Sequence, residues 1–144
     1  MNTFNKIAKR LLIISVLLVA VLSFSACSED PVSPQLENIS GKWDGQFNHP
    51  GYDGGSITLN VLENNSNLSG SFVMRLVKSN RVSNFGGSIT GAKVTNNEYN
   101  LNLNGTNFTF ICDLNLNSKE LMLSGNWESE QQNGISGTMS VQKD

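Results

Sequence analysis

Apolar and polar side chains alternate along most of the chain between residues 39 and 141. Successive side chains of a strand point to opposite faces, so a period of two gives one apolar face, as in half-buried antiparallel strands. No window of this region shows the 3.6-residue period of an amphipathic helix. The pattern therefore predicts an all-β domain. Its eight alternating runs span residues 39–47, 57–61, 68–76, 85–91, 99–103, 108–114, 121–127 and 135–141.

Short turn-forming segments separate these runs and predict how the strands connect. Asn104-Gly105 is a strong hairpin signal, because a two-residue type I′ turn needs positive φ at both central residues. Short links throughout favour an up-and-down meander, whose edges disappear when the sheet closes. We therefore expect residues 39–144 to form an eight-stranded antiparallel up-and-down barrel. Further turn segments lie at residues 64–67, 79–80, 96–97, 117–118 and 133–134.

Glycine recurs at fixed places within the apolar face. An apolar–hydroxyl–glycine motif begins at Ile39, Leu68, Leu123 and Ile135, and Ile89 begins a partial copy that breaks at Lys93. Inward glycines permit strands to bend and to pack closely around a narrow barrel, which is the interpretation we favour. The alternative is that they clear space for a ligand.

Large side chains on the same face can largely fill a narrow barrel, which favours a packed core over a cavity. A void of a few hundred Å³ with convergent polar groups would instead favour ligand binding. These inward residues are Trp43, Phe47, Phe72, Met74, Phe108, Phe110, Trp127 and Met139.

The first run opens with Ile39-Ser40-Gly41-Lys42-Trp43, which resembles the Gly-x-Trp opening of the calycin group, including lipocalins and avidins. The resemblance implies a compact calycin-like barrel. Avidins place a biotin-binding Asn two residues after this Trp, and Gly45 occupies that position here. The resemblance therefore implies a fold and no biotin site.

The N-terminus is organised as an export signal. Lys6, Lys9 and Arg10 precede an apolar run over residues 11–24, which is shorter than the roughly 20 residues of a spanning helix. The following Ser25-Ala26-Cys27 resembles a bacterial lipobox, with Phe24 where Leu is usual. The resemblance implies a signal helix and signal peptide over residues 1–26 and a lipidated Cys27. Residues 27–38 would then form a disordered tether. An ordinary signal peptide and an uncleaved anchor helix are the alternatives.

Charge and cysteine content narrow the possible partners. Without residues 1–26 the chain keeps 7 basic and 12 acidic residues, so its formal charge is -5, which argues against nucleic acid. If Cys27 carries lipid, Cys112 has no cysteine partner, and its apolar neighbours Phe110 and Ile111 predict a buried thiol.

No residue pattern predicts a catalytic site, a metal site or a cofactor. His49 is the only histidine and lies in the longest loop, at residues 49–55, with Asp44 and Asp53 nearby. One His and two carboxylates on such a loop are not a metal signature, and Pro, Gly and Asp are typical turn residues. If the barrel has a ligand mouth, this loop is expected at its rim.

These features predict a bacterial lipoprotein held at the cell envelope by lipid on Cys27, in the outer membrane. The expected role is a non-catalytic binding module for an envelope protein or a small apolar ligand. One alternative is a structural accessory or enzyme-inhibitor module that acts through its loops. The other is a transmembrane barrel with its apolar face outward.

Overall fold

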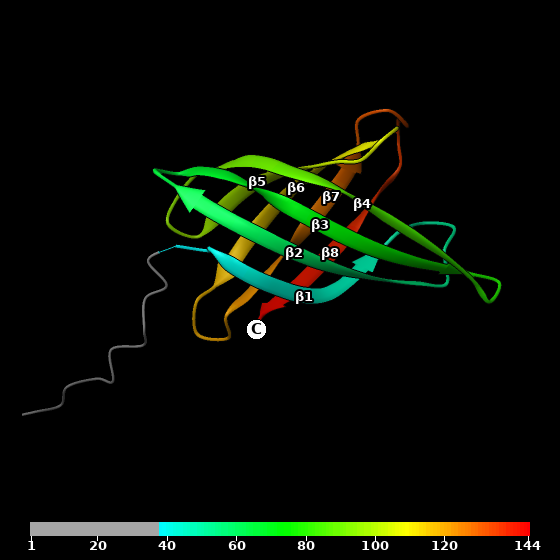
Figure 1. Cartoon of the computed structure of the whole chain (residues 1–144), viewed down its shortest axis with the longest axis horizontal. Coiled ribbons are helices and arrows are strands. Elements are labelled where there is room, and N and C mark those ends of the chain that lie inside the picture. The colour runs from blue at the N-terminus through cyan, green and yellow to red at the C-terminus, as the bar shows by residue number, and fades with distance from the viewer. Residues whose placement is uncertain (1–37) are drawn as a thin grey trace, which may run out of the picture. The chain divides into compact units, whose positions relative to one another are not determined.

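The computed structural model describes residues 38–144, which form one closed antiparallel barrel (Figure 1). The expected signal peptide, Cys27 and all but the last residue of the expected tether lie outside the described residues. The eight strands are β1 (Gly41–Asn48), β2 (Gly54–Asn64), β3 (Asn67–Lys78), β4 (Arg81–Lys93), β5 (Glu98–Asn104), β6 (Thr109–Asn117), β7 (Met122–Ser129) and β8 (Ser136–Lys143).

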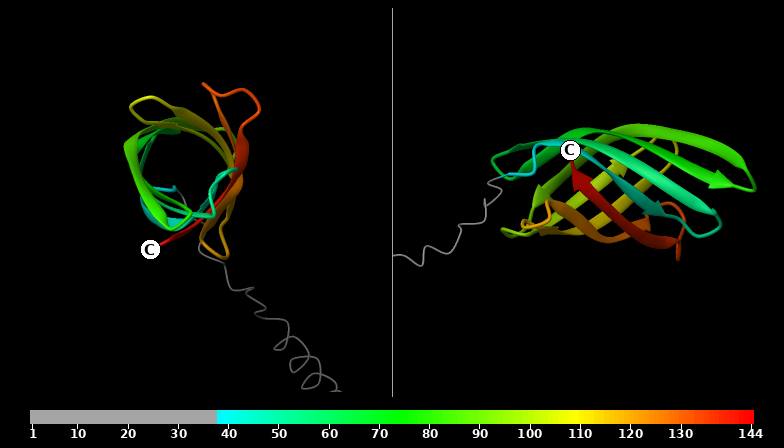
Figure 2. Two further views of the ribbon diagram at one scale, coloured as in Figure 1. Left: turned by 90° about the vertical axis from the view of Figure 1, so that its right-hand side faces the viewer. Right: turned by 90° about the horizontal axis from the view of Figure 1, so that it is seen from below.

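Each strand pairs with the next along the chain, and β8 returns to pair with β1. The closing ladder runs from Trp43 opposite Lys143 to Asn48 opposite Thr138. The predicted up-and-down topology is therefore confirmed, and the view along the barrel shows the ring of strands (Figure 2). The closed antiparallel barrel is also consistent with a calycin-like fold.

The turns lie where the sequence predicts them, but not all of them are of the predicted type. Asn65-Ser66 and Ser79-Asn80 have positive φ at both residues and form two-residue hairpin turns. Asn104-Gly105 does not form the predicted two-residue turn, because Asn104 pairs with Thr109 across a loop at residues 105–108. That register places Phe110 opposite Leu103 on the buried face, so interior packing determines this turn.

The interior is packed with the residues that the alternation assigned to it. Of the eight expected core side chains, all are buried except Phe108, which is half-buried at one end of the barrel. Exposed large hydrophobic residues on the described chain are few: Leu62, Val73, Val82 and Val94. This arrangement is the reverse of a transmembrane barrel, whose apolar face is outward. Residues 38–144 contain no helix that is long and apolar enough to span a membrane.

The inward glycines allow neighbouring strands to approach. A Cβ at Gly125 would overlap with the backbone carbonyl oxygen of Asp113, and one at Gly91 would overlap with that of Asn100. Gly70 also has a φ of 152°, a conformation that other residues rarely adopt. The space at these positions is filled by backbone, which supports the structural interpretation of the motif.

The barrel has two different ends, which we call the mouth and the base. The mouth carries the loops at residues 49–53, 79–80, 105–108 and 130–135. The base carries the remaining turns, and residue 38 and Asp144 also lie there.

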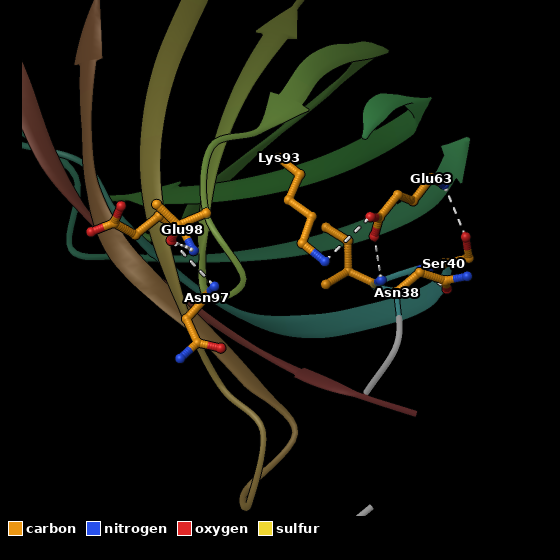
Figure 3. A network of polar contacts seen from close by, with 8 residues as sticks. Asn38, Ser40, Glu63, Lys93, Asn97 and Glu98 are labelled. Atoms are coloured by element: carbon orange, nitrogen blue, oxygen red, sulfur yellow. Dashed lines mark hydrogen bonds and ion pairs between the residues drawn. The ribbon is translucent and has the colours of Figure 1, made fainter. Parts of the chain in front are cut away.

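A polar network fixes the chain at the base (Figure 3). Glu63 Oε2 accepts a hydrogen bond from the Ile39 N–H at 2.8 Å, and Glu63 Oε1 lies 3.8 Å from Lys93 Nζ. The Glu63 N–H in turn donates to Ser40 Oγ at 2.9 Å. Burial and then the charge of Glu63 raise the pKa of Tyr99 to about 12. The Ile39 carbonyl in turn accepts a hydrogen bond from the Trp43 indole N–H at 2.8 Å.

Candidate functional site

Aromatic rings gather in the half of the barrel that ends at the mouth. Phe47 stacks on Trp127 with ring centroids 4.7 Å apart, and Phe110 lies 4.7 Å from Trp127 and 4.9 Å from Phe108. Such tilted and stacked pairs stabilise by about 0.5–1.5 kcal/mol each beyond the area they bury. We call this set the aromatic cluster. It comprises Phe47, His49, Tyr52, Phe72, Phe85, Phe108, Phe110 and Trp127.

Several of these rings lie in or beside the mouth loops in the sequence, and closure of the barrel brings them together. Phe47 and His49 keep the inward alternation as β1 ends. The Tyr52 N–H donates to the His49 carbonyl in a turn that brings the Tyr52 ring within 4.9 Å of the His49 ring. Phe108 closes the loop at residues 105–108, where its carbonyl accepts from Gly105 N–H at 2.8 Å. Phe110 then follows on the inward side of β6.

A cavity of about 210 Å³ lies within the mouth. Met74, Leu76 and Phe110 are buried beneath it, whereas Phe85 and Phe108 are half-exposed. Its lining contains no Asp, Glu, Lys or Arg. Such a cavity offers apolar contact and neutral hydrogen bonds. The full lining is His49, Tyr52, Met74, Leu76, Phe85, Asn107, Phe108, Phe110, Ser129, Gln131 and Gln132.

The polar groups of the rim are partly used by the fold. Gln131 Oε1 accepts from the Thr109 N–H at 2.6 Å, and Ser129 Oγ accepts from the Gln132 N–H at 3.2 Å. His49 Nδ1 lies 2.7 Å from the Pro50 carbonyl oxygen, which can only accept. The Nδ1–H of His49 is therefore assigned as the donor in this contact.

The structure separates the three residues that were considered as a metal set. The loop of His49 does lie at the rim, as expected, and its ring packs 5.1 Å from Trp127. The Asp44 carboxylate instead accepts hydrogen bonds from Lys42 and Thr58 on the barrel exterior. The hydrogen bond from Lys42 is the main cause that lowers the Asp44 pKa. Asp53 accepts from the Ser79 N–H at the β3–β4 turn. No three His, Cys, Asp or Glu side chains of residues 38–144 form a metal-binding group.

The sequence interpretation missed the role of His49 in the aromatic cluster. It treated this residue as part of a turn, because Pro50 and Gly51 follow it. The strand alternation did carry a signal, because His49 is two residues beyond Phe47 and so continues the same inward face.

The thiol of Cys112 is buried, as predicted, in the middle of β6. Burial and then the charge of Asp113 raise the Cys112 pKa from 9.0 to about 12. A thiol of this kind is a core side chain and a poor nucleophile at neutral pH.

We expect this thiol to make the barrel less stable in alkali. Because its folded pKa lies above its unfolded pKa, its contribution is complete below pH 9 and is lost as the pH rises towards 12. Between pH 9 and 10 the wild type should lose about 1 kcal/mol more unfolding free energy than Cys112→Val. Urea unfolding at each pH measures this difference, and parallel pH profiles for the two proteins would contradict it.

Fold and site together define a small closed β-barrel whose mouth holds an aromatic cavity without Asp, Glu, Lys or Arg in its lining. No protein-family model matches the chain, and no curated protein matches its sequence.

Proposed function

We propose that this protein is a lipid-anchored, non-catalytic binding module of the bacterial envelope, with a calycin-like barrel as its binding domain. Its mouth receives a neutral apolar group, either from an envelope protein or from a small apolar ligand. The anchor is proposed from the sequence around Cys27. The binding role rests on one observation, the cavity of half-exposed aromatic rings without a charged lining residue.

The size of the cavity supports a small guest. At about 210 Å³ it is smaller than the roughly 300–1,000 Å³ of typical ligand pockets. Phe47 and Trp127 are fully packed below it, so a long acyl chain has no channel to enter. A ring or a branched aliphatic group matches both the volume and the apolar lining.

The topology also supports this role. Residue 38 lies at the base and the cavity lies at the mouth, so a tether that precedes residue 38 joins the barrel at the end opposite the cavity. This arrangement leaves the mouth accessible in an anchored protein.

An uncharged dye that fluoresces in apolar surroundings, N-phenyl-1-naphthylamine, tests binding at the mouth. We expect Phe108→Ala to weaken dye binding by about tenfold or more, because Phe108 forms part of the aromatic wall. Val73→Ala is the control, since Val73 is an apolar side chain that is 57% exposed on the outside of β3. Absent binding, or equal losses in the two variants, would contradict the proposal.

A further inference from the structure

One strand of the barrel extends well past its neighbour on the mouth side. β4 begins at Arg81, but its ladder with β5 begins only where Ser88 pairs with Asn104. Residues 81–87 of β4 therefore pair with β3 alone among residues 38–144, and the β3–β4 hairpin projects beyond the other strands (Figure 1). We call residues 81–87 the free edge.

The backbone of the free edge is oriented for pairing. Lys93 donates its N–H to Ser66 on the β3 side, so odd-numbered residues of β4 face β3 in this antiparallel ladder. Val82, Asn84 and Gly86 consequently direct their N–H and C=O groups away from β3. No backbone hydrogen bond of theirs to another part of residues 38–144 is present beyond the strand ladders.

The free edge also lacks the protection that exposed edges carry. Soluble proteins protect such edges with charged residues, proline or a covering segment. Residues 82–87 read Val-Ser-Asn-Phe-Gly-Gly, without a charge or a proline, and only Arg81 at the tip is basic. An unprotected edge of this length is suited to accept another strand.

The aromatic cavity adjoins this edge, because Phe85 belongs to both. Its side chain lines the cavity and its ring centroid lies 5.8 Å from that of Phe108. A strand added beside β4 would direct every second side chain to the inner face of the sheet, as Phe85 itself is directed. Backbone pairing with a pocket for alternate side chains is the arrangement of known strand-addition sites.

We propose that the free edge and the mouth together bind an extended segment of an envelope protein, by strand addition to β4. The inference rests on the proposed function and narrows it from an apolar group to a peptide. Residues of the segment that face inward are uncharged and apolar, since the cavity has no charged lining residue. Val82, Asn84 and Gly86 supply the backbone hydrogen bonds.

The probe is a capped peptide as long as the free edge, in which threonine alternates with phenylalanine. In the ¹⁵N-labelled protein we expect fast amide exchange at Val82, Asn84 and Gly86, and slower exchange when the peptide is bound. Asn84→Pro removes a donor that the fold does not use, so it should weaken peptide binding by about tenfold or more. Asn84→Ala keeps the N–H and should bind as the wild type does.

Each result separates this inference from the proposed function. Dye binding without peptide binding overturns strand addition and leaves the mouth as a small-molecule site. Equal peptide affinity for Asn84→Pro and Asn84→Ala also overturns it, as does self-association that protects the free edge without peptide. If the wild type binds neither the dye nor the peptide, the proposed function is overturned as well. If Asn84→Pro fails to fold, the wild type is tested instead with a peptide that is N-methylated on the amides that face β4. Undiminished binding of that peptide overturns the inference.

Discussion

Replacing Gly125 with alanine is expected to destabilise the barrel by about 3 kcal/mol or more, since the added methyl group has no space. The new Cβ would overlap with the Asp113 carbonyl oxygen and lie 3.0 Å from the Leu114 Cα. Both are backbone atoms of β6, so relief requires β6 and β7 to separate. The free energy of unfolding, from urea titration of tryptophan fluorescence, measures the effect.

Gly54→Ala is the matched control for this experiment. A Cβ at Gly54 meets no atom within 4 Å, and its φ is not positive. We expect its stability to stay within about 0.5 kcal/mol of the wild type, as for ordinary surface substitutions. If Gly125→Ala were equally stable, the inward glycines would not be needed for close strand approach.

Cys27→Ser is expected to abolish attachment of fatty acyl chains to the protein in its native cell. The lipobox resemblance implies that the sulfur atom of Cys27 forms a thioether with the lipid. The serine hydroxyl cannot form this bond. Metabolic labelling with a fatty-acid probe, followed by separation of membrane and soluble fractions, measures the loss. The labelled wild type should partition with membranes, because two or more chains give stable anchoring.

Cys112→Ala provides the control for labelling. The chain has 2 cysteines, and Cys112 is buried in the barrel, so this variant should retain the full label. Equal labelling of Cys27→Ser and the wild type would falsify the lipid anchor. It would leave the binding role of the mouth to be decided by the dye and peptide experiments.

The strands and their faces were predictable because they depend on local pattern. Alternation assigned Trp43, Phe72 and Met139 to the interior, and each is 1% exposed or less. The turn segments at residues 64–67 and 79–80 marked two hairpin turns correctly. The burial of Cys112 was also predictable, from its apolar neighbours Phe110 and Ile111.

Features that depend on register were not predictable in the same way. The pattern placed the start of the fourth strand at Phe85, but the strand begins at Arg81 because it continues the ladder with β3. Likewise, the Asn104-Gly105 signal was overridden by the pairing of Leu103 with Phe110. A period of two gives the face of a residue, but the height of that residue along the barrel depends on its neighbours' register.

The candidate site consists of such features. The sequence alone determined an eight-stranded antiparallel sheet with one apolar face, because alternation and turn chemistry act over a few residues. Only the tertiary structure decided that the phenylalanines of residues 38–144 gather with His49 and Trp127 at the mouth. It also decided that β4 projects past β5 beside these rings. Closing the barrel sets the offset between neighbouring strands, and no short stretch of sequence encodes that offset.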